Sequence, residues 1–266
     1  MSYMREVKRQ DWPSYLKRAS IEQTYADVNT MVHAGGYECH TTPSLRYALA
    51  ASILSANNRL DRNGWQVNAI RNYDRMYGHW PTTVDEYKAI TRHGGYECSG
   101  NHARYLLEMD RSYAAGALVE LERMPTNGHE WLLWRHALAG MIVGIANKTA
   151  SMAAMLMWPY HSPLVVCDRH VVARLAFAGA FDTWGMTADV IYKRMLVNSS
   201  RGYALYRRVE RLVGNEKLRL GLEMPTAIWH WHTWDAWRAF VTADEADNSH
   251  ELLSPYWYPN EQTVRG

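Results

Sequence analysis

The chain of 266 residues is long enough for one large domain or two small ones with a substantial core. Its hydrophobic content of 47% and charged fraction of 21% are ordinary for a globular protein, which excludes a fibrous or intrinsically disordered chain. The formal net charge of +2 permits a polyanionic partner without requiring one, because nucleic-acid binding depends on a local basic face.

The three cysteines, Cys39, Cys98 and Cys167, are widely spaced. This argues against a disulfide framework and against a zinc or iron–sulfur site built from cysteine alone, so we expect a reducing, cytoplasmic location. The first residues, MSYMREVKRQDW, lack the apolar core of a signal peptide. The apolar run TASMAAMLMWPYHSPLVVC is broken by WPYHSP, so no membrane span is expected.

Hydrophobic periodicity predicts helices along most of the chain. Pro43 and Ser44 precede the first helix, and Gly94 with Gly95 stops the third. In chain order the predicted helices cover residues 43–58, 63–78, 82–95, 101–121, 130–141, 147–157, 168–178, 186–197, 203–213 and 225–241. The only strand-like stretch, PLVVC, is too short to organise a sheet. The sequence therefore predicts an all-α fold.

The segment VGIANKTA connects two of these predicted helices, 130–141 and 147–157. Gly144 and the small Ala146 let the backbone turn sharply, which predicts a hairpin at about residues 141–148. The second helix begins at this hairpin, and its first backbone N–H groups form a ready site for a phosphate.

This hairpin, followed by VVCDRHVVARL, resembles the helix–hairpin–helix DNA glycosylases of the endonuclease III superfamily. That family has an LPGVGxKTA hairpin, an apolar helix and an xVDTHxxRV continuation. Three further segments resemble the family in the same order: LAASILSANN, HGGYECSGNHARYL and PTAIWHWHTWDAWR. The resemblance thus covers residues 43 to 240, with weak individual pieces in a specific order.

The resemblance implies a two-lobed helical fold with an active-site cleft between the lobes. The expected lobes are a central one, residues 42–160, and a second one formed by residues 1–41 with 161–266. The implied partner is double-stranded DNA containing a modified or damaged base. We expect a monomer that flips this base out of the duplex and excises it, leaving an abasic site.

The two expected catalytic residues are Asp168 and Lys148. Breaking an N-glycosidic bond develops positive charge on the sugar, and a nearby carboxylate stabilises it. By resemblance, the Lys148 amine attacks the sugar C1′ and adds a strand-nicking lyase activity. Such a lysine must be neutral, and partial burial beside a helix N-terminus favours the neutral form.

Further site residues divide into two groups by their expected contacts. The base-binding candidates have amide or aromatic side chains: Asn57, Asn58, Tyr96 and Trp229. The DNA-binding candidates lie in the hairpin and after the aspartate: Gly144, Ala146, Asn147, Thr149, Arg169 and His170.

The sequence departs from the family pattern in three respects. Ala146 stands where the hairpin has its second glycine, so its backbone must avoid a positive φ or adopt one at a cost. The interval from Lys148 to Asp168 is slightly longer than in the family. The family's iron–sulfur cysteines are missing, so we expect no cofactor and no metal, with room for a monovalent cation at the hairpin.

Plainer interpretations exist for each candidate. A lysine in the first turn of a helix is commonly solvated, an aspartate before a helix is commonly an N-cap, and Asn57 with Asn58 could cap a helix C-terminus. His230 and His232 are two positions apart, which does not favour a metal site on a helix. Residues 201–220 contain six basic and two acidic residues, either a solvated face or a phosphate-contacting flank.

Three functional hypotheses remain open from the sequence. The first is a glycosylase, whose substrate could be a bulky phage-type modified pyrimidine in antiphage defence. The second keeps the fold but joins a nucleophile to a pyrimidine base, as in phage-related base hypermodification. The third is a non-catalytic DNA-binding module.

Overall fold

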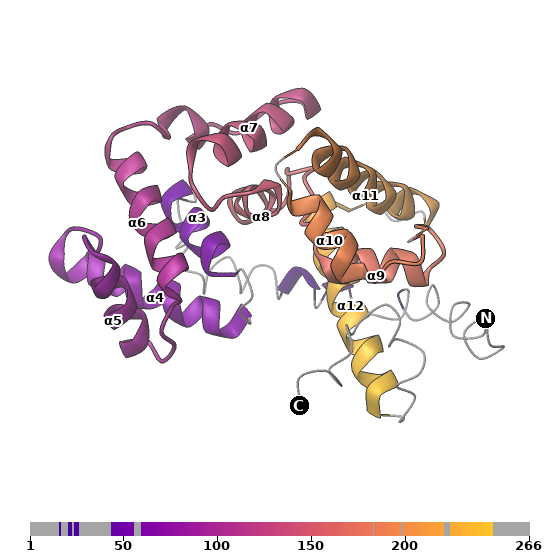
Figure 1. Cartoon of the computed structure of the whole chain (residues 1–266), viewed down its shortest axis with the longest axis horizontal. Coiled ribbons are helices and arrows are strands. Elements are labelled where there is room, and N and C mark those ends of the chain that lie inside the picture. The colour runs from indigo at the N-terminus through magenta and orange to yellow at the C-terminus, as the bar shows by residue number, and fades with distance from the viewer. Residues whose placement is uncertain are drawn as a thin grey trace. The chain divides into compact units, whose positions relative to one another are not determined.

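A computed structural model describes residues 16, 21–22, 24–26, 44–55, 60–182, 184–197, 199–220 and 224–246 (Figure 1). Over these ranges the secondary structure consists of ten α-helices, one 3-10 helix and further helical residues at 16, 21–22 and 24–26, without a strand, which confirms the all-α prediction. None of the described helices is both long and apolar enough to cross a membrane.

The chain divides into two compact units, Ala26–Leu164 and Met1–Tyr25 with Val165–Gly266. The lobes expected from the sequence, 42–160 and 1–41 with 161–266, stay a prediction, as does the cleft between them. Each unit has its own helices and its own core, and each is described separately below.

The unit 26–164 contains α3 (Leu45–Leu54), α4 (Leu60–Tyr77), α5 (Val84–His93), α6 (Gly100–Ala114), η1 (Val119–Glu122), α7 (Gly128–Met141) and α8 (Asn147–Met157). Helices α3 and α8 are its centre, because they are buried on nearly every side and pack against each other. Figure 1 shows α3 between α6 and α8, and α3 contacts both of them.

Polar side chains define where several helices of this unit begin. Thr83 and Glu86 form a reciprocal capping box at the start of α5. Asn127 accepts two backbone N–H bonds at the start of α7. These caps satisfy N–H groups that have no partner inside the helix, so the sequence itself marks the helix starts.

The second unit contains α9 (Arg169–Phe177), α10 (Ala188–Leu196), α11 (Ser200–Arg219) and α12 (Thr226–Ala246). Helix α9 packs against the other three and is buried from Val171 to Phe177. Its Arg174 is almost fully buried and forms an ion pair with the equally buried Glu216 of α11. This pairing lets a charged residue lie inside the core of the unit.

The largest differences from the predicted helix boundaries are in two helices. The predicted helix 101–121 ends at Ala114, because Gly116 adopts a φ of 74° and a 3-10 helix follows after the turn. The predicted helix 203–213 instead covers Ser200–Arg219. It continues past Gly214 because Val213 and Glu216 are both buried on its inner face.

Candidate active site

The predicted hairpin is a short connection, residues 142–146, between α7 and α8. The Ile142 backbone N–H donates to the Leu138 carbonyl, and the Ile145 N–H donates to the Ile142 carbonyl, both at 3.2 Å. The side chains of Ile142 and Ile145 are buried, whereas Val143 between them is exposed. The two isoleucines therefore anchor the connection and leave its tip at the surface.

Gly144 is the residue on which this connection depends. Its φ is 85°, a conformation that side chains with a Cβ rarely adopt. A Cβ at this position would also lie 2.4 Å from the Tyr105 ring of α6. Both the backbone conformation and the space available therefore require glycine.

Ala146 avoids the positive φ considered from the sequence. Its φ of −108° and ψ of 178° are extended backbone, which alanine adopts without strain. Ala146 is the N-cap of α8 and offers no side-chain cap to the first turn, where Asn147, Lys148 and Thr149 lie half-buried. The start of α8 thus presents backbone N–H groups that no side chain at the cap position covers.

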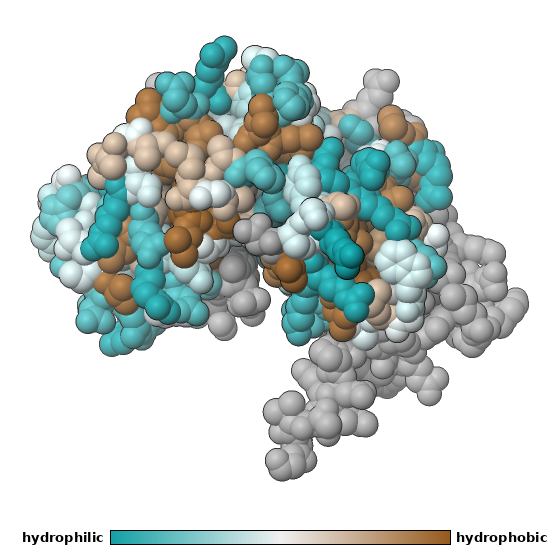
Figure 2. Space-filling view, turned by 45° about the horizontal axis from the view of Figure 1, so that its top comes forward, coloured by the Kyte–Doolittle hydropathy of each residue, from teal (hydrophilic) through white to brown (hydrophobic). Residues whose placement is uncertain are grey.

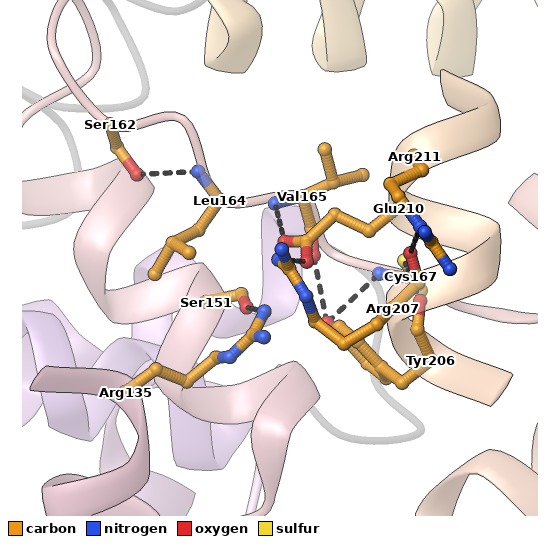
Figure 3. Close-up of polar contacts among 10 residues, drawn as sticks. All are labelled: Arg135, Ser151, Ser162, Leu164, Val165, Cys167, Tyr206, Arg207, Glu210 and Arg211. Atoms are coloured by element: carbon orange, nitrogen blue, oxygen red, sulfur yellow. Dashed lines mark hydrogen bonds and ion pairs between the residues drawn. The ribbon is translucent and has the colours of Figure 1, made fainter. Parts of the chain in front are cut away.

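The two helices of the hairpin are fixed to each other by polar and aromatic contacts. The buried Arg135 of α7 donates from Nη1 to Ser151 Oγ of α8 at 3.3 Å (Figure 3). Trp131 and Trp134 of α7 lie against Trp158, with ring centroids 5.4 and 5.6 Å from it. These edge contacts hold the hairpin in a fixed orientation.

The strand-like residues before Asp168 form neither helix nor strand, and the Cys167 N–H donates to the Val165 carbonyl at 3.1 Å in a three-residue turn. Two α11 side chains hold this segment (Figure 3). The Tyr206 hydroxyl donates to the Val165 carbonyl at 2.7 Å and accepts from the Cys167 N–H at 3.2 Å. The Glu210 carboxylate accepts from the Val165 N–H at 3.1 Å and pairs with Arg207. These α11 side chains therefore add to the hydrogen bond that the backbone of the segment makes with itself.

Asp168 follows this segment directly and is the N-cap of α9. Its Oδ1 accepts the Val171 backbone N–H at 3.0 Å, so the plainer interpretation, a helix cap, is confirmed. Arg169 and His170 form the first turn of α9. The ring of His170 lies edge-on to Trp234 of α12, with centroids 5.9 Å apart.

The base-binding candidates lie in different surroundings. Asn57 and Asn58 fall outside the described residues. Tyr96 is exposed, and its carbonyl accepts from the buried Gln66 side chain at 2.9 Å. Trp229 is 0% exposed, and its indole N–H is buried without an acceptor among the described residues. Such a donor is costly to leave unbonded.

The predicted catalytic residues belong to different units, Lys148 to 26–164 and Asp168 to the other. Tyr206 and Glu210, which hold the segment before Asp168, were missed by the sequence analysis. A signal existed for Glu210, because it is a carboxylate beside the apolar positions Tyr206, Val209 and Val213 of its helix.

Two further observations concern ligands and relatives. Over the described ranges, no group of three or more His, Cys, Asp or Glu side chains gathers as metal ligands do. Searches against protein-family models, curated proteins and solved structures each found no match to this chain.

Proposed function

We propose that this protein is a DNA glycosylase, which flips a modified base out of duplex DNA and cleaves its N-glycosidic bond. The observation that carries the proposal is a pair of backbone segments with a fixed conformation, one leading to Lys148 and one to Asp168. One is the tight connection at Gly144, and the other is the segment before Asp168 held by Tyr206 and Glu210. Both elements end on a residue whose chemistry the reaction needs.

The hairpin supports the DNA-binding part of this proposal. Its tip is exposed at Val143, and α8 begins without a side-chain cap. A phosphate of the DNA backbone would accept from the N–H groups of Asn147 and Thr149, with the partial positive charge of the helix N-terminus adding to the attraction. Arg169 and His170 would contact the strand from the start of α9.

The chemistry assigned to Asp168 is electrostatic. As the glycosidic bond breaks, the sugar becomes oxocarbenium-like, and a carboxylate next to C1′ stabilises the positive charge. Asp168 would also orient a water molecule for attack at C1′. Its Oδ1 bond to the Val171 N–H fixes the side-chain rotamer, so the carboxylate is oriented before the substrate binds.

Lys148 would give a second route to the same bond cleavage. In this route Nζ forms a bond to C1′ while the departing base takes the glycosidic electrons and a proton. The C1′–O4′ bond then opens, with O4′ taking a proton, and the Schiff base so formed permits strand cleavage on the 3′ side. We propose no cofactor for either route, a monomeric enzyme, and a reducing cytoplasmic location for its free, buried Cys98 and Cys167.

A flipped base would need polar recognition as well as stacking. The buried indole N–H of Trp229 has no acceptor among the described residues, and a base carbonyl would supply one once the side chains that cover Trp229 move aside. Tyr96 and the amides of Asn57 and Asn58 complete the proposed base-binding set. The substrate class we favour is a bulky modified pyrimidine.

Asp168→Asn is the decisive variant. Asparagine caps helices as well as aspartate does, so the fold should be retained while the negative charge is lost. We expect base release from modified duplexes, measured as abasic sites, to fall about 100-fold or more, with DNA affinity unchanged. Thr187→Ala removes the cap of α10 in the same unit and should leave base release intact.

Borohydride trapping tests the role of Lys148. On a duplex that contains the modified base, the wild-type protein should form a covalent adduct with the sugar from which the base is released. Lys148→Gln should form no adduct. Lys193→Gln, an exposed lysine on α10, is the matched control and should trap normally. If the protein makes abasic sites but forms no trapped adduct, then water alone attacks C1′. Lys148 would in that case serve only in DNA binding.

A non-catalytic DNA-binding module is the second candidate, and the cap at Asp168 favours it. A carboxylate that bonds the Val171 N–H has a structural reason to be where it is, without any reaction. This candidate predicts that the wild-type protein binds DNA and makes no abasic sites on ordinary, damaged or phage-modified substrates. It also predicts that Asp168→Asn behaves as wild type in every assay.

A further inference from the structure

Helix α11 separates its charges by sign. Both of its carboxylates are buried: Glu216 pairs with Arg174 inside the core, and Glu210 accepts from the Val165 backbone. The negative charges of this helix are therefore neutralised within the unit. Its outer face carries no acidic residue to offset the basic ones.

The basic residues of α11 fall into two groups. Arg207 pairs with Glu210, and Lys217 donates to the Met224 carbonyl at 2.9 Å, so both are engaged inside the unit. The remaining four are exposed and have no carboxylate partner among the described residues: Arg201, Arg208, Arg211 and Arg219. We call these four residues the arginine face.

The arginine face follows the length of the helix. Arg201, Arg208 and Arg219 recur at spacings of 7 and 11 residues, which keeps them on one side of a helix, and Arg211 lies beside them. The rise of 1.5 Å per residue separates Arg201 from Arg219 by about 27 Å. That length equals about eight base pairs of a DNA strand. Figure 2 shows hydrophilic residues over the part of the surface where α10 and α11 lie.

An exposed aromatic residue lies next to this face. Trp184, in the connection between α9 and α10, is 55% exposed and has a φ of 49°. It is the only non-glycine residue with a positive φ in the described part of the chain. For a bulky side chain this conformation is unfavourable, and such strain is common where a residue has a binding role.

Arg208 connects Trp184 to the arginine face. Its guanidinium lies 5.0 Å from the Trp184 ring centroid and 5.3 Å from that of Phe181. Phe181 is buried and contacts Trp184 edge-on at 5.9 Å, while Asp182 fixes the backbone by accepting the Trp184 N–H at 2.8 Å. An indole ring is thus held at the surface beside a row of positive charges.

We propose that the arginine face and Trp184 form a second DNA-contact surface, separate from the hairpin, which binds the phosphate backbone and stacks on an unpaired base. A row of guanidinium groups matches phosphates, each of which can accept two parallel N–H bonds. An exposed indole beside arginine is the combination that stacks on bases. The inference rests on the proposed function only in taking DNA as the polyanion, because binding here requires no base release.

The salt dependence of DNA binding tests the arginine face. Each phosphate contact adds about 0.9 to the slope of log K against log salt concentration. Arg208→Gln/Arg211→Gln should lower that slope by about 2 on a fluorescent duplex followed by anisotropy, with Tm unchanged. Arg111→Gln/Arg123→Gln removes the same charge from exposed positions of the other unit and should leave the slope unchanged. An equal effect of both pairs would show that total charge alone matters and would overturn the proposal.

Trp184→Gly tests the stacking. Glycine adopts the positive φ freely, so the variant should fold with an unchanged Tm. We expect about tenfold weaker binding to a duplex with a single-base bulge and unchanged binding to the fully paired duplex. Equal affinity for the bulged duplex would overturn the stacking role.

The competing partner is an acidic protein. Poly-glutamate of equal charge should displace the oligonucleotide much more weakly than unlabelled DNA does, and equal displacement would overturn the assignment to DNA. All of these binding assays are run on unmodified DNA. An absence of base release by the wild-type protein would therefore refute the proposed function and leave this inference standing.

Discussion

Two independent features require glycine at position 144, and substitutions can separate their contributions to stability. Gly144→Ala should lower the free energy of unfolding by about 2–4 kcal/mol, since it combines an unfavourable φ with overpacking against Tyr105. Urea denaturation measures the loss. Gly140→Ala, at a position with open space on α7, should be neutral or stabilising by up to about 1 kcal/mol.

Tyr105 distinguishes the two contributions. In a Tyr105→Ala background the ring that an added Cβ would meet is absent, so Gly144→Ala should cost only the conformational part, about 1–2 kcal/mol. A cost equal to that in the wild-type background would show that the backbone conformation accounts for the whole effect. The double-mutant cycle thus measures the close packing directly.

The sequence could identify residues that a local pattern defines. Gly144 was predictable from the turn between two apolar helices, and the N-cap at Asp168 from its place before a helix. Tyr206 and Glu210 were not, because their partners are backbone groups about 40 positions away. Hydrogen bonds between residues so far apart in the chain leave no periodic pattern in the sequence. The one indication was the carboxylate of Glu210 on an apolar helix face.

At the scale of elements, one hydroxyl bonds two backbone groups of the segment before Asp168. Tyr206→Phe removes the hydroxyl that bonds both the buried Val165 carbonyl and the buried Cys167 N–H, and leaves these two groups only the 3.1 Å bond between them. Losing the hydroxyl's hydrogen bonds to these groups should lower the free energy of unfolding by about 1 kcal/mol. Hydrogen exchange should show faster exchange of the Cys167 amide. Tyr77→Phe, at an exposed tyrosine of α4, should change neither quantity.

Helix α12 contains a contact that depends on pH. His232 Nδ1 accepts from the Thr24 hydroxyl at 3.0 Å, and Nε2 donates to the Leu16 carbonyl at 3.2 Å. Burial holds the pKa of His232 below its ordinary value of about 6.5, although the bond to Leu16 opposes this shift. The unfolded chain therefore takes up this proton at a higher pH than the folded protein does.

The consequence is a loss of stability in acid. The stabilisation is complete above about pH 6.5 and decreases as the pH falls from there towards the lowered pKa of His232. Tm measured from pH 8 to about pH 5 should show this decrease. His232→Gln should be less stable at pH 8 and should show a smaller decrease in acid. An identical pH profile in the variant would assign the decrease to other groups.

Helix boundaries show how far local signals reach. The predicted starts of α5, α7 and α9 agree with the structure within three residues, and each of these helices begins at a residue whose side chain caps it. The end of α11 was predicted too early, because Gly214 and Asn215 are ordinary signals for a helix end. Burial of Glu216 against Arg174 outweighs the low helix propensity of one glycine, about 1 kcal/mol. That ion pair joins two different helices, so a local sequence pattern does not predict it.

At the scale of the whole molecule, the all-α class followed from periodicity because each helix buries its own apolar face. The pairing of helices did not follow from it. Helix α3 packs on α8, about 100 residues later, because both are apolar on nearly every side and only another buried helix can cover them. The sequence likewise identified the two residues proposed for catalysis by the chemistry of their side chains, whereas the structure assigned them to separate units.

This division makes a prediction about a fragment. Residues 26–164 contain α3 to α8, the hairpin and Lys148, but neither Asp168 nor the arginine face. Because α3 and α8 supply a core of their own, the fragment should unfold cooperatively when heated, followed by circular dichroism. It should bind duplex DNA with a smaller salt slope than the full chain and should release no base. Full-length Asp168→Asn is the control, which binds at full strength and also releases no base. Base release by the fragment would show that a carboxylate within 26–164 performs the reaction, and Asp168 would then be a helix cap alone.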